Sequence, residues 1–288
     1  MASDNRFAVL IDADNVSVKY IKIILDEISK DGIATYKRIY GDWTNPSLIS
    51  WKSVLLDNSI NPIQQYSYTT GKNSTDSAMI IDAMDILYSG KVDGFCLVSS
   101  DSDFTRLAAR LRESGMTVIG MGESKTPNSF IAACNKFKYL DILSAADEEE
   151  PEEAPAPKPE PAKKAAPQKK APQKKAAAAK KAKEEPKPEK EQKPEAKRQQ
   201  QEEIEEPRTS LGTIRRALRT IVRENSDEDD WIIIGKIGNL LDKRYPDFDV
   251  RNFGFSKLTP FLESLDMFEI RDMKKDGNSS PQKYVRLK

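Results

Sequence analysis

The chain has 288 residues with 46 Lys and Arg, 46 Asp and Glu, and no histidine, so its formal net charge is zero. Without histidine, Ser-His-Asp catalysis, Cys-His catalysis and His-ligated zinc are excluded. Cys96 and Cys134 provide neither a Cys-rich zinc site nor a disulfide framework, and they fit a reducing, cytoplasmic location. No apolar run approaches the roughly 18 residues that cross a bilayer, so we expect no membrane association. Any chemistry must use carboxylates, Lys or Arg, hydroxyls or a bound metal.

Composition divides the chain into three segments. Residues 1–146 carry about 15 basic and 17 acidic residues, residues 147–207 about 15 and 16, and residues 208–288 about 16 and 13. The middle segment holds about 11 of the 17 prolines and no aromatic residue. It cannot bury enough apolar surface to offset the entropy of ordering it, so we expect a disordered linker. Its lysine pairs fit non-specific nucleic-acid binding and a plain soluble spacer equally well.

The first segment alternates short apolar strands with longer periodic helices, which predicts an α/β fold with a parallel sheet. We expect strands at 7–11, 35–40, 62–66, 94–100 and 117–122, and helices at 17–29, 46–58, 75–89, 103–114 and 128–134. In such a sheet the ligand crevice lies beyond the carboxyl ends of the strands. The residues that directly follow each strand are therefore the candidates for a functional site.

Aspartates occupy two of these strand ends. Asp12 and Asp14 follow the first strand, Asp101 and Asp103 follow the fourth, and Asp76 begins the helix between them. Grouped carboxylates repel by about 1 kcal/mol per pair at 4 Å in water, and a bound cation relieves this repulsion. Oxygen ligands without imidazole or thiolate select Mg²⁺ or Mn²⁺. Each aspartate taken singly is also explained as a helix cap or a turn residue.

The sequence gives weaker indications of function for the other charged residues near these strand ends. Lys72, before Asp76, and Arg106, after Asp103, are candidate contacts to an RNA phosphate, with an ordinary exposed side chain as the alternative for each. Asp82 and Asp85 lie opposite the apolar positions of their helix, so we expect both to be exposed to solvent. A nucleotide pocket is not favoured, because the sequence has neither GxGxxG after the first strand nor GxxxxGK[ST].

Four motifs in this segment carry a family resemblance: LIDADN (10–15), GKNSTDSAMIIDAMDIL (71–87), VSSDSDFTRLAARLRESGMTVIGMG (98–122) and FKYLDIL (137–143). Together they resemble the NYN domain of the LabA-like group, in the PIN-like nuclease superfamily. The resemblance implies a metal-dependent ribonuclease centre in which Asp12, Asp76, Asp101 and Asp103 bind the metal and Asn15 orients a ligand or water beside Asp12. Mg²⁺ or Mn²⁺ would support cleavage of RNA without histidine.

The last segment predicts several short helices followed by two extended pieces, the arrangement of a winged helix-turn-helix. Its first helix has apolar residues at helical spacing, namely Leu211, Ile214, Leu218, Ile221 and Val222. The segment resembles the LOTUS, or OST-HTH, domain at Trp231, Ile234, Gly238, Leu241, YPDFD (245–249), Arg251, FGF (253–255) and Phe261. This resemblance implies an adaptor that binds RNA or a protein partner. Candidate phosphate contacts are Lys236, Lys243, Arg244, Arg251 and Lys257.

The sequence thus predicts an NYN nuclease domain over 1–146, a linker over 147–207 and a winged-helix LOTUS domain over 208–288. The function we expect is metal-dependent cleavage of single-stranded RNA, with single-stranded or structured RNA as the partner and the linker as a flexible tether that raises the local RNA concentration. The alternative is a non-catalytic RNA-binding or scaffold protein with the same fold. A phosphatase or DNA nuclease using the same carboxylates, and a DNA-binding helix-turn-helix, remain open as well.

Overall fold

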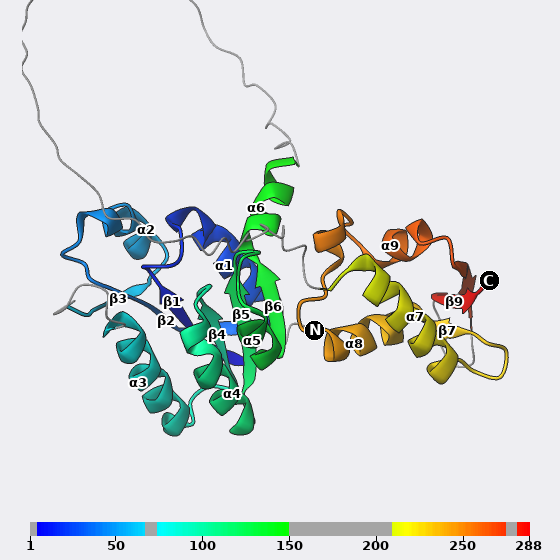
Figure 1. Ribbon diagram of the computed structural model, residues 1–288, viewed down its shortest axis with the longest axis horizontal. Helices are drawn as coiled ribbons and strands as arrows, with labels where there is room; N and C mark the ends of the chain where they lie inside the picture. The colour runs from blue at the N-terminus through cyan, green and yellow to red at the C-terminus, as the bar shows by residue number, and fades with distance from the viewer. Residues whose placement is uncertain (1–4, 67–73, 150–208, 275–280) are drawn as a thin grey trace, which may run out of the picture. The chain divides into compact units, whose positions relative to one another are not determined.

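The computed structural model describes residues 5–66, 74–149, 209–274 and 281–288 (Figure 1). The predicted linker over 147–207 lies outside these ranges except for its first three residues, which continue helix α6 (Leu140–Glu149) past the predicted domain boundary. Within the described ranges, no helix is both long enough and apolar enough to cross a membrane.

The N-terminal part is built on a six-stranded parallel sheet. In chain order the strands are β1 (Arg6–Asp12), β2 (Ile33–Gly41), β3 (Asn61–Gln64), β4 (Gly94–Val98), β5 (Thr117–Gly122) and β6 (Lys136–Tyr139). Their order across the sheet is β3-β2-β1-β4-β5-β6, and every neighbouring pair is parallel. Buried apolar strands such as β4 are typical of a parallel sheet covered on both faces. The predicted α/β class is confirmed, and β6 is a strand that we did not predict.

Helices cover both faces of this sheet (Figure 1). Side chains of α1 (Ile21–Asp31), α2 (Trp51–Asp57) and α6 share one core with Val9 and Ile11 of β1. The other core contains Ala8 and Leu10 of β1 with α3 (Ser74–Ser89), α4 (Thr105–Glu113) and α5 (Asn128–Ala133). Short 3-10 turns precede α1, α2 and α4, at η1 (Val18–Tyr20), η2 (Pro46–Leu48) and η3 (Ser102–Phe104).

The C-terminal part combines helices with a small antiparallel sheet. Its elements are α7 (Leu211–Asn225), β7 (Ile232–Ile233), α8 (Ile234–Arg244), η4 (Val250–Phe253), α9 (Leu258–Ser264), β8 (Phe268–Met273) and β9 (Gln282–Leu287). The two predicted extended pieces form the β8–β9 pair, and β7 joins β9 on its other side. The predicted apolar stripe of α7 is buried except at Leu211, which is 43% exposed.

Asp82 of α3 is not a solvated surface residue, contrary to our prediction. Its carboxylate accepts hydrogen bonds from the Arg38 guanidinium and the Tyr40 hydroxyl, both of β2. Burial, and then the Asp82 carboxylate, raise the pKa of Tyr40. Asp85 is exposed as predicted. Asp82 therefore fixes α3 against β2, and it does so about 9 Å along the helix from Asp76.

Gly122, at the carboxyl end of β5, allows the chain after β4 to approach closely. A Cβ atom at this position would lie 2.7 Å from the Ser99 carbonyl oxygen and 2.6 Å from the Thr126 hydroxyl oxygen. The Ser100 hydroxyl accepts a hydrogen bond from the Glu123 amide at 2.9 Å, which holds the two strand ends together. A side chain here would push β5 away from the residues that lead into Asp101.

Replacing Asp82 tests the link between α3 and β2. We expect Asp82→Ala to lower the free energy of unfolding by about 1–3 kcal/mol, because the buried Tyr40 hydroxyl loses its acceptor. The matched control is Asp85→Ala, which removes the same charge from an exposed position and should change stability by less than about 0.5 kcal/mol. Urea unfolding measures both. Equal losses in the two variants would contradict the assigned role of Asp82.

Replacing Gly122 tests the close approach at the end of β5. We expect Gly122→Ala to cost about 1–3 kcal/mol of unfolding free energy, because the new methyl group meets a backbone oxygen that cannot move independently. In the control Gly235→Ala, the added methyl group has open space near the start of α8, so stability should stay equal or rise by up to about 1 kcal/mol. Thermal melts should therefore show a lower melting temperature for Gly122→Ala and an equal or higher one for Gly235→Ala; an equal fall in both would contradict the close approach inferred at Gly122.

Candidate functional site

The candidate site lies at the point in the sheet where the strand order reverses: β2 and β3 follow β1 toward one edge, and β5 and β6 follow β4 toward the other. Strands β1 and β4 are neighbours at the centre of the sheet, and their register pairs Ile11 with Val98. Connections leave this point toward opposite edges, so a crevice forms beyond the carboxyl ends of β1 and β4. Asp12 is the last residue of β1, and Ser99 directly follows β4. The topology thus brings together the two aspartate-rich strand ends.

Asp12 is fully buried at the base of this site. Its Oδ2 accepts hydrogen bonds from the Asn15 side-chain amide at 2.7 Å and from the Ser99 hydroxyl at 2.8 Å, while its Oδ1 accepts from the Asp14 backbone amide at 3.1 Å. Burial raises the pKa of Asp12, and these hydrogen bonds counteract only part of the effect. Asn15 therefore orients Asp12 itself.

Three other carboxylates converge beside it. One oxygen from each of Asp76, Asp101 and Asp103 can be chosen so that all lie within 4.8 Å of one another. Asp76 belongs to the first turn of α3, and Asp101 caps η3 by accepting a hydrogen bond from the Asp103 amide at 2.9 Å. Asp101 therefore caps η3, as the alternative explanation predicts, and it also belongs to the carboxylate cluster.

The electrostatics of the cluster favour a bound cation. Burial first, and then the charges of Asp12, Asp101 and Asp103, raise the pKa of Asp76 to about 6. A divalent cation among these oxygens would lower that pKa, because it replaces repulsion between like charges by attraction. The donor set consists of carboxylate oxygens, which Mg²⁺ and Mn²⁺ prefer. The residues present therefore fit a hard divalent cation, and the identity of the ligands stays a prediction.

Two supporting residues were missed by the sequence analysis. The buried Ser99 hydroxyl donates to Asp12 and accepts a hydrogen bond from the Asp101 amide at 3.1 Å, so it links the ends of β1 and β4. The Thr75 hydroxyl donates to Asp14 at 2.9 Å and ties α3 to the residues after β1. The sequence held one indication of the role of Ser99, which is that it immediately follows a buried apolar strand.

The predicted phosphate contacts are dispersed. Lys72 lies outside the described residues, and Arg106 is exposed on α4, three residues after Asp103. In the C-terminal part, Lys236, Lys243, Arg244 and Lys257 are exposed, and the Lys236 ammonium donates to the Asn225 carbonyl at 3.3 Å. Arg251 differs from these four, because its guanidinium is paired with the carboxylates of Asp249 and Glu27. It is not an available phosphate contact in this structure.

Comparison with known proteins identifies both folded parts. Residues 6–141 match the family model of the NYN domain, and residues 207–279 match that of the OST-HTH/LOTUS domain. No curated protein matches the chain. A crystal structure of a protein of unknown function from Vibrio parahaemolyticus is 20% identical, with a TM-score of 0.41, and the match covers 49% of this chain and 97% of that one. The chain therefore contains an NYN domain, of PIN-like α/β fold, followed by an OST-HTH/LOTUS domain.

Proposed function

We propose that the NYN domain hydrolyses RNA phosphodiester bonds with the help of Mg²⁺ or Mn²⁺, and that the LOTUS domain binds RNA. The observation that supports the catalytic part is the convergence of Asp76, Asp101 and Asp103 beside buried Asp12. The family matches add support, because NYN domains are related to PIN-like nucleases and LOTUS domains to RNA binding.

The four aspartates have different tasks in this proposal. Asp76, Asp101 and Asp103 would hold the cation. Asp12, which the sequence resemblance counts among the metal ligands, lies outside that group of three oxygens; Asn15 and Ser99 fix its orientation, and it would act beside the cation. The cation, when bound, would acidify the attacking water and stabilise the charge that develops on the leaving oxygen. Water adds to phosphorus, the bond from phosphorus to the leaving oxygen breaks, and the products are a phosphate monoester and a hydroxyl group. The chain has no histidine to act as a base, so the reaction depends on carboxylates and metal.

Replacing Asp101 tests the catalytic proposal. Asp101→Asn keeps a side-chain oxygen that can cap η3, so the fold should be retained while one charged ligand is lost. We expect cleavage of labelled single-stranded RNA in Mg²⁺ or Mn²⁺ to fall by about 100-fold or more, because the site loses an anionic ligand and would hold the metal, and the water on it, less firmly. The control Asp85→Asn removes an exposed charge and should cleave like the wild type.

Equal cleavage by all three proteins would point to a contaminating nuclease. If wild type binds the RNA and leaves it intact in both metals, the protein is a non-catalytic RNA binder.

The pKa of Asp76 gives a stability test that is independent of catalysis. Because this pKa is raised to about 6, the folded state holds a proton that the unfolded state releases near pH 4. Without divalent cations, stability should therefore decline as pH rises from about 4 to 6. Asp76→Asn should weaken this decline, leaving the part due to Asp12, whose pKa is also raised, and it should be more stable than wild type at pH 7 by about 1–2 kcal/mol.

Added Mg²⁺ completes the stability test. It should raise the melting temperature of the wild type at pH 7 and have little effect on Asp76→Asn, because a ligand that binds only the folded state stabilises it. The control Asp85→Asn should respond to Mg²⁺ like the wild type. An Asp76→Asn variant that is less stable than wild type in EDTA at pH 7 would contradict the repulsion inferred for this cluster.

A further inference from the structure

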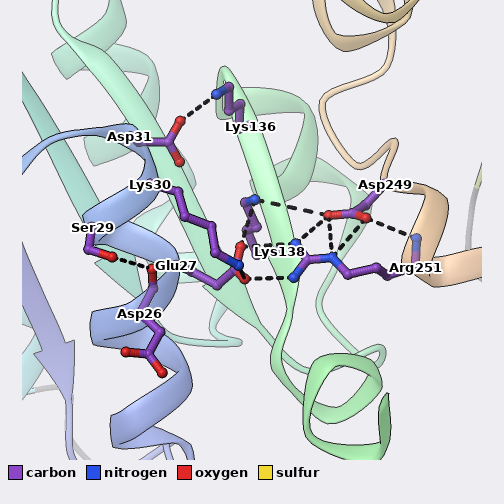
Figure 2. Close-up of polar contacts among 9 residues, drawn as sticks. All are labelled: Asp26, Glu27, Ser29, Lys30, Asp31, Lys136, Lys138, Asp249 and Arg251. Carbon is purple, nitrogen blue, oxygen red and sulfur yellow. Dashed lines mark hydrogen bonds and ion pairs between the residues drawn. The ribbon is translucent and has the colours of Figure 1, made fainter. Parts of the chain in front are cut away.

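Two ion pairs connect α1 with β6 inside the NYN domain. Glu27 and Asp31 are one helical turn apart on α1, and Lys138 and Lys136 are two residues apart on β6. The two spacings match, at about 6 Å along a helix and about 6.6 Å along a strand. The Lys138 ammonium lies 2.8 Å from Glu27 Oε2, and the Lys136 ammonium 2.5 Å from Asp31 Oδ1. This face of the NYN domain therefore presents an ordered row of charges (Figure 2).

Arg251 of the LOTUS domain adds a two-pronged contact to this row. Its Nη1 donates to Glu27 Oε1 at 2.6 Å and its Nη2 to Glu27 Oε2 at 2.9 Å, while its Nε donates to Asp249 at 3.0 Å. Figure 2 shows the guanidinium between the two carboxylates, with Lys138 reaching toward both. Paired donors of this kind match the geometry of a carboxylate and are among the strong polar contacts in proteins.

Glu27 is the most deeply buried member of the cluster, with a side chain only 3% exposed. Burial alone would raise the pKa of Glu27, but the hydrogen bonds from Arg251, Lys138 and Lys30 outweigh burial and hold the pKa well below its usual range. The carboxylate is therefore charged at all ordinary pH values. A buried charge requires such partners, because removal of one partner leaves the other without solvation.

Contacts along β6 accompany the ion pairs. The Phe137 amide donates to the Pro246 carbonyl at 2.7 Å, and the Tyr139 hydroxyl donates to Asp247 at 3.3 Å. Phe137 and Tyr139 belong to the outermost strand of the sheet, whose outer side does not pair with another strand of that sheet. The LOTUS residues involved lie in the YPDFD segment (245–249), two positions before Arg251.

We propose that Glu27 together with strand β6 forms a docking site for the LOTUS domain of the same chain, with Arg251 as its ionic anchor. The occupant is identified by charge complementarity and by the contacts of residues 246–251. The apolar packing is incomplete, because a cavity of about 280 Å³ is lined by Phe137 and Lys138 and by Pro246 and Leu258. Docking needs little intrinsic affinity, because both surfaces belong to one chain.

Docking has a consequence for RNA binding. While the LOTUS domain is docked, the Arg251 guanidinium is committed to Glu27 and Asp249 and cannot contact a phosphate. The exposed residues Lys243, Arg244 and Lys257 stay accessible in either state. The two domains thus do more than share a tether, because a specific contact restricts their arrangement.

Single-molecule energy transfer on the full chain tests this proposal. Dyes can be attached at Ser53→Cys and Glu224→Cys, which are exposed positions in the two domains, because the native Cys96 and Cys134 are buried. In the wild type we expect one narrow distribution of transfer efficiency. Glu27→Gln and Arg251→Gln should each broaden it and increase the undocked fraction at least about tenfold, because each leaves a charge without its partner. The double variant should be disturbed less than the sum of the two single variants, because it leaves neither charge of the Glu27–Arg251 pair alone.

The matched control is Asp26→Asn, which removes one charge from the neighbouring exposed residue of α1 and should keep the narrow distribution. Glu27 also pairs with Lys138 inside the NYN domain, so circular dichroism and thermal melts must show that Glu27→Gln is folded. If Glu27→Gln is unfolded, the transfer-efficiency distribution of Arg251→Gln tests the same contact, because this variant changes only the LOTUS residue of the pair. A wild-type distribution as broad as that of Arg251→Gln, or identical narrow distributions in all the proteins, would overturn the docking site.

Discussion

A parallel sheet must bury both faces, and this requirement determines where chemistry can occur in the NYN domain. Helices cover the two faces, so functional side chains are accessible at the carboxyl ends of the strands. The strand order places β1 beside β4 at the centre, where Asp12 and the residues after Val98 meet. Two residues outside the site support its geometry. Asp82 fixes α3, the helix that carries Asp76, and Gly122 lets β5 approach the chain after β4.

Asp76 and Glu27 show how two buried carboxylates of one domain reach opposite electrostatic states. Both lose hydration, which favours the neutral form. Around Asp76 the neighbours are further carboxylates, and its pKa is raised to about 6. Around Glu27 the neighbours are Arg251, Lys138 and Lys30, and its pKa is lowered. The first environment is suited to binding a cation from solution, whereas the second is already neutralised by side chains of the chain itself.

Local patterns in the sequence predicted most of the NYN fold and the aspartates of the candidate site. Strands β1, β4 and β5 are continuous apolar runs, and the aspartates directly follow two of them. Strand β6 escaped prediction because four residues that alternate lysine with an aromatic give too short a pattern. Asp82 was assigned to solvent because helical periodicity cannot show that a flank of α3 meets β2. The pairing of Arg251 with Glu27 joins residues 224 positions apart, so no local pattern carries it.

The two outer strands of the sheet are protected from unwanted pairing in different ways. Strand β3 contains Pro62, which has no amide hydrogen to offer a further strand. Strand β6 has no such residue, and its Phe137 amide is satisfied by a carbonyl of the LOTUS domain. A chain cut after α6 would retain the whole acidic site and yet present an open strand edge to other copies of itself. Through this hydrogen bond the LOTUS domain covers part of a strand edge that the NYN domain leaves without a partner strand in its own sheet.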